Sequence, residues 1–313
     1  MRVAAWLVVV LGCAASVAHA GARPAWASDA LVATVAVHEA SGNDAQMVVM
    51  TFLPPGPGPF PVVVFSHGRD PSAAGRASLA VGVSRAQRVF WLARGVAVVS
   101  PLRPGYGASA ASDLEGAGAS IDRAGHCSGH ADFRKAADAA VLSVEATLQW
   151  LRGQAWADTS AVLLVGQSAG GLATVAAGAR ELPGVMGYVN FAGGTGGNPE
   201  RVPGASCDPG QLQALYADYG RSTTVPNLWL YALNDQYWGP AMPRGWHAAF
   251  ARGGSPTTFV QAPAVPDGDG HGLSRHAPAL WAHAVDELLA RLGFPWDAAT
   301  APRPVLRMDP GGT

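Results

Sequence analysis

The sequence predicts one doubly wound α/β domain, because strand-like apolar runs alternate with helical segments after a hairpin-like start. Residues 62–68, 96–105 and 161–166 form continuous apolar runs rich in β-branched residues. Such runs are typical of strands buried on both faces of a parallel sheet. Before them, residues 30–40 and 45–56 resemble two strands joined by an "SGND" turn. The pattern favours a mostly parallel sheet with an antiparallel hairpin at its beginning.

The rest of the chain continues this alternation. Helical periodicity over residues 77–94 ends at Gly95, a residue type that often follows a helix C-terminus. Further strands are expected at "VMGYVNFAGG", "NLWLYALND" and "TTFVQAP". Two segments rich in glycine and other small residues are expected to be loops, at 105–130 and 193–226. The remaining predicted helices are a segment that ends near Arg152, then 169–181, 240–252 and 278–292.

The composition indicates a folded protein with a large core. Of the 313 residues, 49% are hydrophobic and 14% are charged, against roughly 25% charged in typical globular domains. The formal net charge is −1, and there is no basic run with interleaved aromatic residues. These properties argue against nucleic acid as a partner.

The N-terminus has the pattern of an export signal. Residues 1–20 combine Arg2, an apolar stretch and a small-residue "AHA" cleavage site. The apolar stretch is too short for a stable membrane span, so we expect a secreted or periplasmic protein cleaved near Ala20. The alternative is a lipoprotein anchored at Cys13 within "VLGC". We therefore divide the chain into a signal peptide (1–20), a leader with the first strand (21–44), a catalytic domain (45–294) and an irregular tail (295–313).

Two cysteines remain after removal of the signal. Cys127 and Cys207 are an even pair in a protein expected outside the cytoplasm, where disulfides form and persist. We therefore predict a disulfide between them. The "HCSGH" segment around Cys127 places His126 and His130 four residues apart, but it offers no further metal ligands, so no metal is predicted.

Ser168 is the candidate nucleophile. It occupies the centre of Gly166-Gln167-Ser168-Ala169-Gly170, between a predicted strand and a predicted helix. That context is the one in which a G-x-S-x-G sequence forms a nucleophile elbow. Its glycines allow a sharp turn and close packing around a strained serine.

A serine hydroxyl needs a base to remove its proton and an acid to orient that base. Asp235 follows the next-to-last predicted strand, and His271 lies in the "DGDGHGL" loop after the last one. Their order after the serine, acid and then histidine, is that of the elbow architecture. Asp267 and Asp269 are closer to His271 in sequence and are the alternative acids, although turn-forming or solvated roles suit them better. His247, His276 and His283 fall in helical or near-helical segments and are not predicted to act as bases.

The same architecture predicts where an oxyanion would bind. One backbone N–H comes from the residue after the nucleophile, Ala169, at a helix N-terminus. The other comes from the loop after the first long parallel strand, where "FSHGRD" points to Arg69. His67 in this loop is expected to support the loop and to take no part in the chemistry.

These motifs together resemble the α/β-hydrolase superfamily, and within it the secreted branch similar to dienelactone hydrolases and prolyl oligopeptidases. The resemblance rests on "VVVFSHG", "VVSPLRPGYGAS", "GQSAGG", "LYALND" and "DGHG" and covers roughly residues 45–294. It implies a Ser168–His271–Asp235 triad without a cofactor. Two departures limit it: dienelactone hydrolases use a cysteine where this chain has Ser168, and the chain has no room for the propeller of prolyl oligopeptidases.

The sequence thus predicts a secreted serine hydrolase that cleaves carboxylic esters. A peptidase or amidase of the same superfamily and a non-catalytic binding protein with this fold are the alternatives. We expect the substrate pocket to be formed by loops 103–130, 193–226 and 236–246. The aromatic residues of these loops are expected either to line the pocket or, equally, only to pack beneath the loops. "GGTGG" at 193–197 lacks the residues of a phosphate loop and is expected to be a flexible loop. The candidate pocket residues are Tyr106, Tyr237, Trp238 and Trp246.

Overall fold

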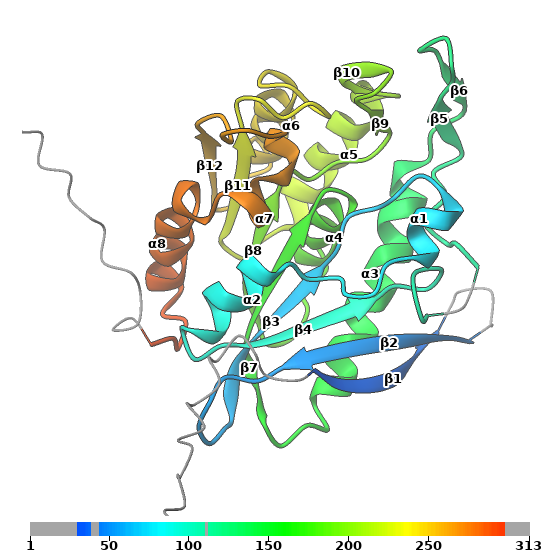
Figure 1. Ribbon diagram of the computed structural model, residues 1–313. Helices are drawn as coiled ribbons and strands as arrows, with labels where there is room; N and C mark the ends of the chain where they lie inside the picture. Colours follow the sequence, from blue (N-terminus) through cyan, green and yellow to red (C-terminus); the bar gives the residue numbers. More distant parts are fainter. Residues whose placement is uncertain (1–29, 39–43, 110–111, 298–313) are drawn as a thin grey trace, which may run out of the picture.

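The computed structural model of the protein is shown in Figure 1. The predicted signal peptide, the alternative anchor at Cys13 and residues 298–313 of the predicted tail lie outside the described part of the chain. The residues that the structure describes are 30–38, 44–109 and 112–297.

An eight-stranded mixed sheet forms the centre of the molecule, in the order β1-β2-β4-β3-β7-β8-β11-β12. β1 pairs antiparallel with β2, and β2 pairs antiparallel with β4. The other neighbours are parallel. The antiparallel hairpin beside a parallel sheet confirms the predicted fold class. The strands are β1 (Leu31–His38), β2 (Asp44–Phe52), β3 (Phe60–Ser66), β4 (Ala97–Leu102), β7 (Ala157–Gln167), β8 (Val185–Phe191), β11 (Asn227–Ala232) and β12 (Thr257–Ala262).

Helices cover both faces of the sheet, because the central strands are apolar on both sides. In β3, Val62 and Val64 belong to the core on one face and Val63 to the core on the other, as the alternation of side chains along a strand requires. α3, α4, α5 and α6 pack on the first face, and α2 and α8 pack on the second. The helices are α1 (Ala73–Ala77), α2 (Arg85–Leu92), α3 (Phe133–Leu151), α4 (Ala169–Gly178), α5 (Pro209–Ser222), α6 (Met242–Ala251), α7 (Leu273–His276) and α8 (Ala282–Leu292).

Within the described residues, no helix combines the length and the apolar character needed to cross a bilayer.

The predicted helix over residues 77–94 is wrong in its extent. The segment contains the end of α1 and the separate helix α2, whose N-terminus is capped by the Ser84 hydroxyl. A β-carbon at Gly82 would lie 2.7 Å from the Ser100 hydroxyl oxygen, so the chain passes closely over β4 between the two helices. This close approach interrupts the helix.

The predicted loop at 193–226 is also wrong in part, because it contains α5. Asp208 caps this helix by accepting a hydrogen bond from the Gln211 backbone N–H, and Pro209 occupies its first turn. Both are ordinary helix-start signals. The two predicted loops also contain short hairpins, β5 (Ala119–Ile121) with β6 (Cys127–Gly129) and β9 (Gly197–Asn198) with β10 (Val202–Ser206).

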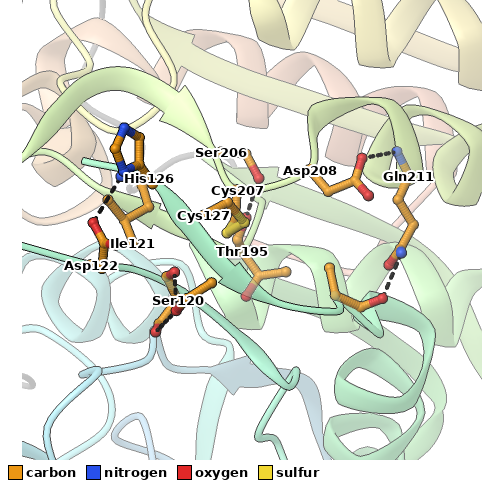
Figure 2. The surroundings of a disulfide bond; sticks show 12 residues. Ser120, Ile121, Asp122, His126, Cys127, Thr195, Ser206, Cys207, Asp208 and Gln211 are labelled. Atoms are coloured by element: carbon orange, nitrogen blue, oxygen red, sulfur yellow. Dashed lines mark hydrogen bonds between the residues drawn. A yellow bond between two sulfur atoms is a disulfide. The ribbon is translucent and has the colours of Figure 1, made fainter. Parts of the chain in front are cut away.

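A disulfide joins these two hairpin regions, as the sequence predicts (Figure 2). Cys127 begins β6 and Cys207 follows β10, with their Cα atoms 5.1 Å apart, within the range that a disulfide allows. On the α5 side, the Gln211 side chain accepts from the Phe133 backbone N–H and donates to the Ala131 carbonyl. The disulfide and these hydrogen bonds connect the start of α5 to the start of α3.

Candidate active site

Ser168 lies at a sharp turn between β7 and α4. Its backbone has φ 58° and ψ −125°, a region that non-glycine residues occupy at an energetic cost and that occurs often at functional sites. A β-carbon at Gly166 would lie 2.0 Å from the Gly170 carbonyl oxygen, and one at Gly170 would lie 2.0 Å from the Ser66 carbonyl oxygen. The two glycines of the motif are therefore required by close backbone packing.

Asp235 and His271 meet at the same end of the sheet. Asp235 follows β11, and His271 lies in the short 3₁₀ turn Gly270–Gly272 after β12. Nδ1 of the imidazole is 3.2 Å from both carboxylate oxygens. The Asp235 side chain is fully buried, and its Oδ1 also accepts hydrogen bonds from the backbone N–H groups of Tyr237 and Trp238. These bonds fix the carboxylate against the imidazole.

Within the described residues, neither alternative acid is hydrogen-bonded to the imidazole. Asp269 Oδ1 accepts from the backbone N–H groups of Gln236 and His271, at 2.9 and 2.8 Å. It therefore shapes the turn that carries the histidine. Asp267 is exposed and has a positive φ of 55°, as a loop turn residue does.

Ser168 and His271 line one open cavity of about 380 Å³, a size suited to a small molecule. The side-chain hydrogen bonds of His271 both go to Asp235, and none joins it to the Ser168 hydroxyl. Bonds between nucleophile and base are often long without substrate and shorten when it binds. The cavity is also lined by the loop after β3, with Gly68 and Arg69, and by Tyr106 and Tyr237.

The backbone N–H groups of Arg69 and Ala169 are both unpaired within the described residues. Ala169 is the first residue of α4, where an N–H has no acceptor inside the helix. A β-carbon on Gly68 would lie 3.3 Å from the Ser168 β-carbon, so the loop that carries Arg69 passes beside the serine. The two donors are thus available for an external acceptor.

A network of buried and half-buried charged side chains contacts this loop. The Arg69 side chain forms a bidentate pair with Asp113 and a 3.2 Å hydrogen bond to the Tyr106 hydroxyl. Arg103 forms a bidentate pair with Glu115, and both residues are buried. Burial and the Glu115 charge raise the pKa of Tyr106 to about 12. Arg103 and Glu115 were missed by sequence reasoning, because their pairing across a loop follows no local spacing.

His67 supports the loop after β3, in the position that the sequence predicts for it. Its Nδ1 donates to the Gly68 carbonyl at 2.7 Å, and its Nε2 accepts from the Arg103 backbone N–H at 3.2 Å. Burial, aided by the Arg103 charge, holds the pKa of His67 well below its usual range. The imidazole therefore stays neutral, as its accepting Nε2 requires.

The predicted pocket residues divide into two groups. Tyr106 and Tyr237 line the cavity, and the Tyr237 ring stacks on the His271 ring with centroids 4.0 Å apart. Trp238 and Trp246 are not among the lining residues; both are buried in the core. Trp238 donates its indole N–H to the Ala192 carbonyl and stands edge-on to His271. Trp238 therefore helps to hold the His271 ring in place without lining the cavity.

The 193–197 segment is packed, contrary to the expected flexible loop. β-carbons on Gly194 and Gly197 would lie 2.8 and 2.7 Å from the Trp238 ring. The glycines let the backbone lie flat against this indole.

For a metal site, no group of three or more possible ligand side chains occurs in the described part of the chain, and Cys127 forms the disulfide.

The chain matches known proteins in structure but not in sequence. No family model and no curated protein sequence matches it. Among solved structures, the Pyrococcus furiosus esterase Pf2001 matches with a TM-score of 0.56 and 14% identity, over 86% of this chain and 92% of that one. A puromycin-hydrolyzing peptidase of Mycobacterium tuberculosis matches with a TM-score of 0.52 and 20% identity, over 86% of this chain.

The chain spans only 40% of the length of that peptidase. A third neighbour is a 2,6-dihydroxy-pseudo-oxynicotine hydrolase, with a TM-score of 0.51 and 16% identity over 83% of this chain and 68% of that one. At these identities the likeness concerns the fold. The sheet order, the serine turn after β7 and these neighbours together show that the chain has the α/β-hydrolase fold.

Proposed function

We propose that the protein is a serine hydrolase that cleaves carboxylic esters through Ser168, His271 and Asp235. The observation that carries the proposal is the arrangement of the three side chains. Ser168 sits in a strained turn on the same cavity as His271, and Nδ1 of that histidine is held by a buried carboxylate. A capping serine or a structural histidine needs neither feature.

In the proposed mechanism, the Ser168 hydroxyl oxygen attacks the ester carbonyl carbon while Nε2 of His271 takes its proton. Asp235 orients the imidazole and stabilises its cationic form. The backbone N–H groups of Arg69 and Ala169 bind the oxyanion of the tetrahedral intermediate. The carbon–oxygen bond to the alcohol then breaks, and the alcohol leaves with the proton from His271.

The second half of the reaction regenerates the enzyme. A water molecule gives a proton to His271 and attacks the acyl group on Ser168. A second tetrahedral intermediate forms against the same two N–H groups. It collapses to the carboxylic acid, and the proton returns from His271 to the serine oxygen.

An amide substrate is the second candidate, since the triad itself does not distinguish the two bonds. One neighbour is a peptidase and another an esterase. A cavity of about 380 Å³ favours a small substrate, and we place esters first. We expect turnover of p-nitrophenyl acetate and butyrate and little turnover of aminoacyl-p-nitroanilides. Faster cleavage of the anilides would reassign the protein as a peptidase or amidase.

A non-catalytic binding protein is the remaining alternative. It predicts that wild type and Ser168→Ala behave alike towards every ester in the panel. Hydrolysis by wild type and its loss in Ser168→Ala would exclude this alternative.

We also propose that the protein acts outside the cytoplasm. The disulfide between Cys127 and Cys207 supports an oxidising compartment. Mass spectrometry of the mature protein should find an N-terminus at Gly21. An acylated N-terminal Cys13 would instead establish the lipoprotein alternative.

A further inference from the structure

The loop after β3 is fixed through its carbonyl groups. The Gly68 carbonyl accepts a hydrogen bond from His67 Nδ1 at 2.7 Å and a longer one, 3.4 Å, from Arg103 Nη2. The neighbouring His67 carbonyl accepts from Arg103 Nη1 at 2.6 Å. One buried guanidinium thus holds two consecutive carbonyl groups of this loop.

The Gly68 carbonyl belongs to the same peptide unit as the Arg69 N–H. This peptide bond is trans, since the one cis bond in the described residues is Gly58–Pro59. In a planar trans peptide, the C=O and N–H groups point in opposite directions. Holding the Gly68 oxygen on the Arg103 side therefore turns the Arg69 N–H to the other side of the peptide. The loop borders the Ser168 cavity.

Arg103 is itself held firmly. It follows β4, and its side chain is 1% exposed. Glu115 pairs with its Nε and Nη2 atoms, and the Glu115 carboxylate also accepts from the Tyr106 hydroxyl at 3.0 Å. The guanidinium uses its planar fork to join the carboxylate and both loop carbonyls, an arrangement that a lysine ammonium does not reproduce.

We propose that Arg103 and Glu115 are positioning residues that aim the Arg69 N–H at the oxyanion. The inference rests on the proposed function, and it assigns a role to a buried ion pair that does not touch the substrate. Arg103 acts through the Gly68–Arg69 peptide, and Glu115 acts through Arg103. Loss of either interaction should impair binding of the transition state more than binding of the ester.

Arg94 provides a matched control elsewhere in the molecule. Its guanidinium is also buried, pairs in bidentate fashion with Asp286 and donates to a backbone carbonyl, that of Phe90. Arg94 does not line the Ser168 cavity. Arg94→Lys therefore perturbs an equivalent buried pair without disturbing the loop after β3.

The test compares wild type, Arg103→Lys, Glu115→Gln and Arg94→Lys. Each protein is assayed with p-nitrophenyl acetate as substrate and with an alkyl trifluoromethyl ketone as inhibitor. The adduct of this ketone with Ser168 carries an oxyanion. Removal of one oxyanion donor typically costs about a hundred- to a thousandfold in turnover. We expect misalignment in Arg103→Lys to lower kcat by about ten- to a hundredfold and to weaken the ketone by a similar factor. KM should change by less than about twofold. Glu115→Gln should move in the same direction by about tenfold, and Arg94→Lys should leave kcat, KM and ketone affinity near wild type.

The proposal is overturned if Arg103→Lys and Glu115→Gln keep wild-type kcat and ketone affinity, or if Arg94→Lys loses as much of both. If Arg103→Lys does not fold, the kcat and ketone affinity of Glu115→Gln alone decide whether the proposal holds. Labelling of the wild type by a fluorophosphonate distinguishes failure of the proposed function from failure of this inference. An unlabelled, inactive wild type refutes the proposed function, whereas an active wild type with unaffected variants refutes only this inference.

Discussion

Two walls support the Ser168 cavity, each formed by lining residues and by the residues packed behind them, and they are built in opposite ways. One wall, called here the polar wall, is held together by charges that are paired beneath the surface. The other, the packed wall, is held by backbone lying against aromatic rings. The polar wall consists of the lining residues Arg69, Arg76 and Tyr106 and, behind them, Arg103, Asp113 and Glu115. The packed wall consists of the lining residue Tyr237 and, behind it, Gly194, Gly197, Asp235 and Trp238.

The difference follows from what each wall has to hold. In the proposed mechanism, the polar side holds the Arg69 backbone N–H, whose direction depends on hydrogen bonds to the neighbouring His67 and Gly68 carbonyl groups. On the packed side, the proposed mechanism uses the His271 ring and the Asp235 carboxylate. A flat ring is positioned well by the stacked Tyr237 and the edge of Trp238. Under this proposal, directional hydrogen bonds position the N–H group and dense packing positions the imidazole ring.

The largest effect is expected from removing the charge in the packed wall. Asp235→Asn should lower kcat by about three to four orders of magnitude, because the imidazole loses the acceptor that fixes its tautomer. Substrate binding should change little. Steady-state kinetics on p-nitrophenyl acetate measures both quantities.

Asp267→Asn and Asp269→Asn are the matched controls and should keep most activity. Asp269 holds backbone N–H groups, and Asp267 is an exposed turn residue. Near-normal turnover in folded Asp235→Asn together with a collapse in Asp269→Asn would move the acid to the loop.

The next effect concerns the disulfide, which links the chain after Glu115 of the polar wall to the chain after Gly197 of the packed wall. Its cysteines are 80 residues apart, and closing a loop of that length stabilises a protein by about 4 to 5 kcal/mol in the chain-entropy model. Cys127→Ser/Cys207→Ser should therefore lower the free energy of unfolding by up to this amount, measured by urea titration. Activity at 25 °C should stay near wild type. An unchanged midpoint, or free thiols in the unfolded and unreduced wild type, would contradict the disulfide.

A smaller effect tests the packing directly. In Gly194→Ala, the new methyl group would meet the buried Trp238 ring at 2.8 Å. Overpacking of this kind costs about 1 to 3 kcal/mol, and the melting temperature should fall by several degrees. The control, Gly116→Ala, lies beside Glu115 of the polar wall, and its β-carbon would meet nothing within 4 Å. If both substitutions have the same effect, close packing is not what distinguishes the walls.

The smallest effect is the pH dependence of stability. Burial lowers the pKa of His67, in the loop after β3, and the pKa of His247 in α6, the latter to about 4. Both imidazoles are neutral in the folded state, and the unfolded chain takes up protons below about pH 6.5. Their contribution is therefore fully present above pH 6.5 and is lost as the pH falls through about 6.5 to 4. Denaturant titrations should show this decline, with a shallower slope in His247→Gln. An equal slope in that variant would contradict a neutral His247.

Much of this arrangement was predictable from the sequence, because it depends on local patterns. Apolar β-branched runs specified the central strands, and the glycines around Ser168 marked its turn. Ser168, Asp235 and His271 each follow a predicted parallel strand, so their side chains were expected to meet at the carboxyl ends of those strands. Each of these signals lies within one element and its flanking turn.

The parts that the sequence analysis missed are of two kinds. Helix α5 had a readable signal: Asp208 and Pro209 begin it, and Leu212, Leu215 and Tyr219 form an apolar face. The surrounding glycine- and proline-rich composition obscured that pattern. The pairing of Arg103 with Glu115 had no such signal, because two side chains twelve positions apart in an irregular segment meet only through the tertiary fold.

The central claim is that Ser168 is the nucleophile, and covalent labelling tests it most directly. Wild type and Ser168→Ala are treated with a fluorophosphonate, digested and examined by mass spectrometry. We predict one phosphonylated residue in the wild type, Ser168, and an unlabelled but folded Ser168→Ala. Labelling of a different residue, or equal labelling of the two proteins, would contradict the account.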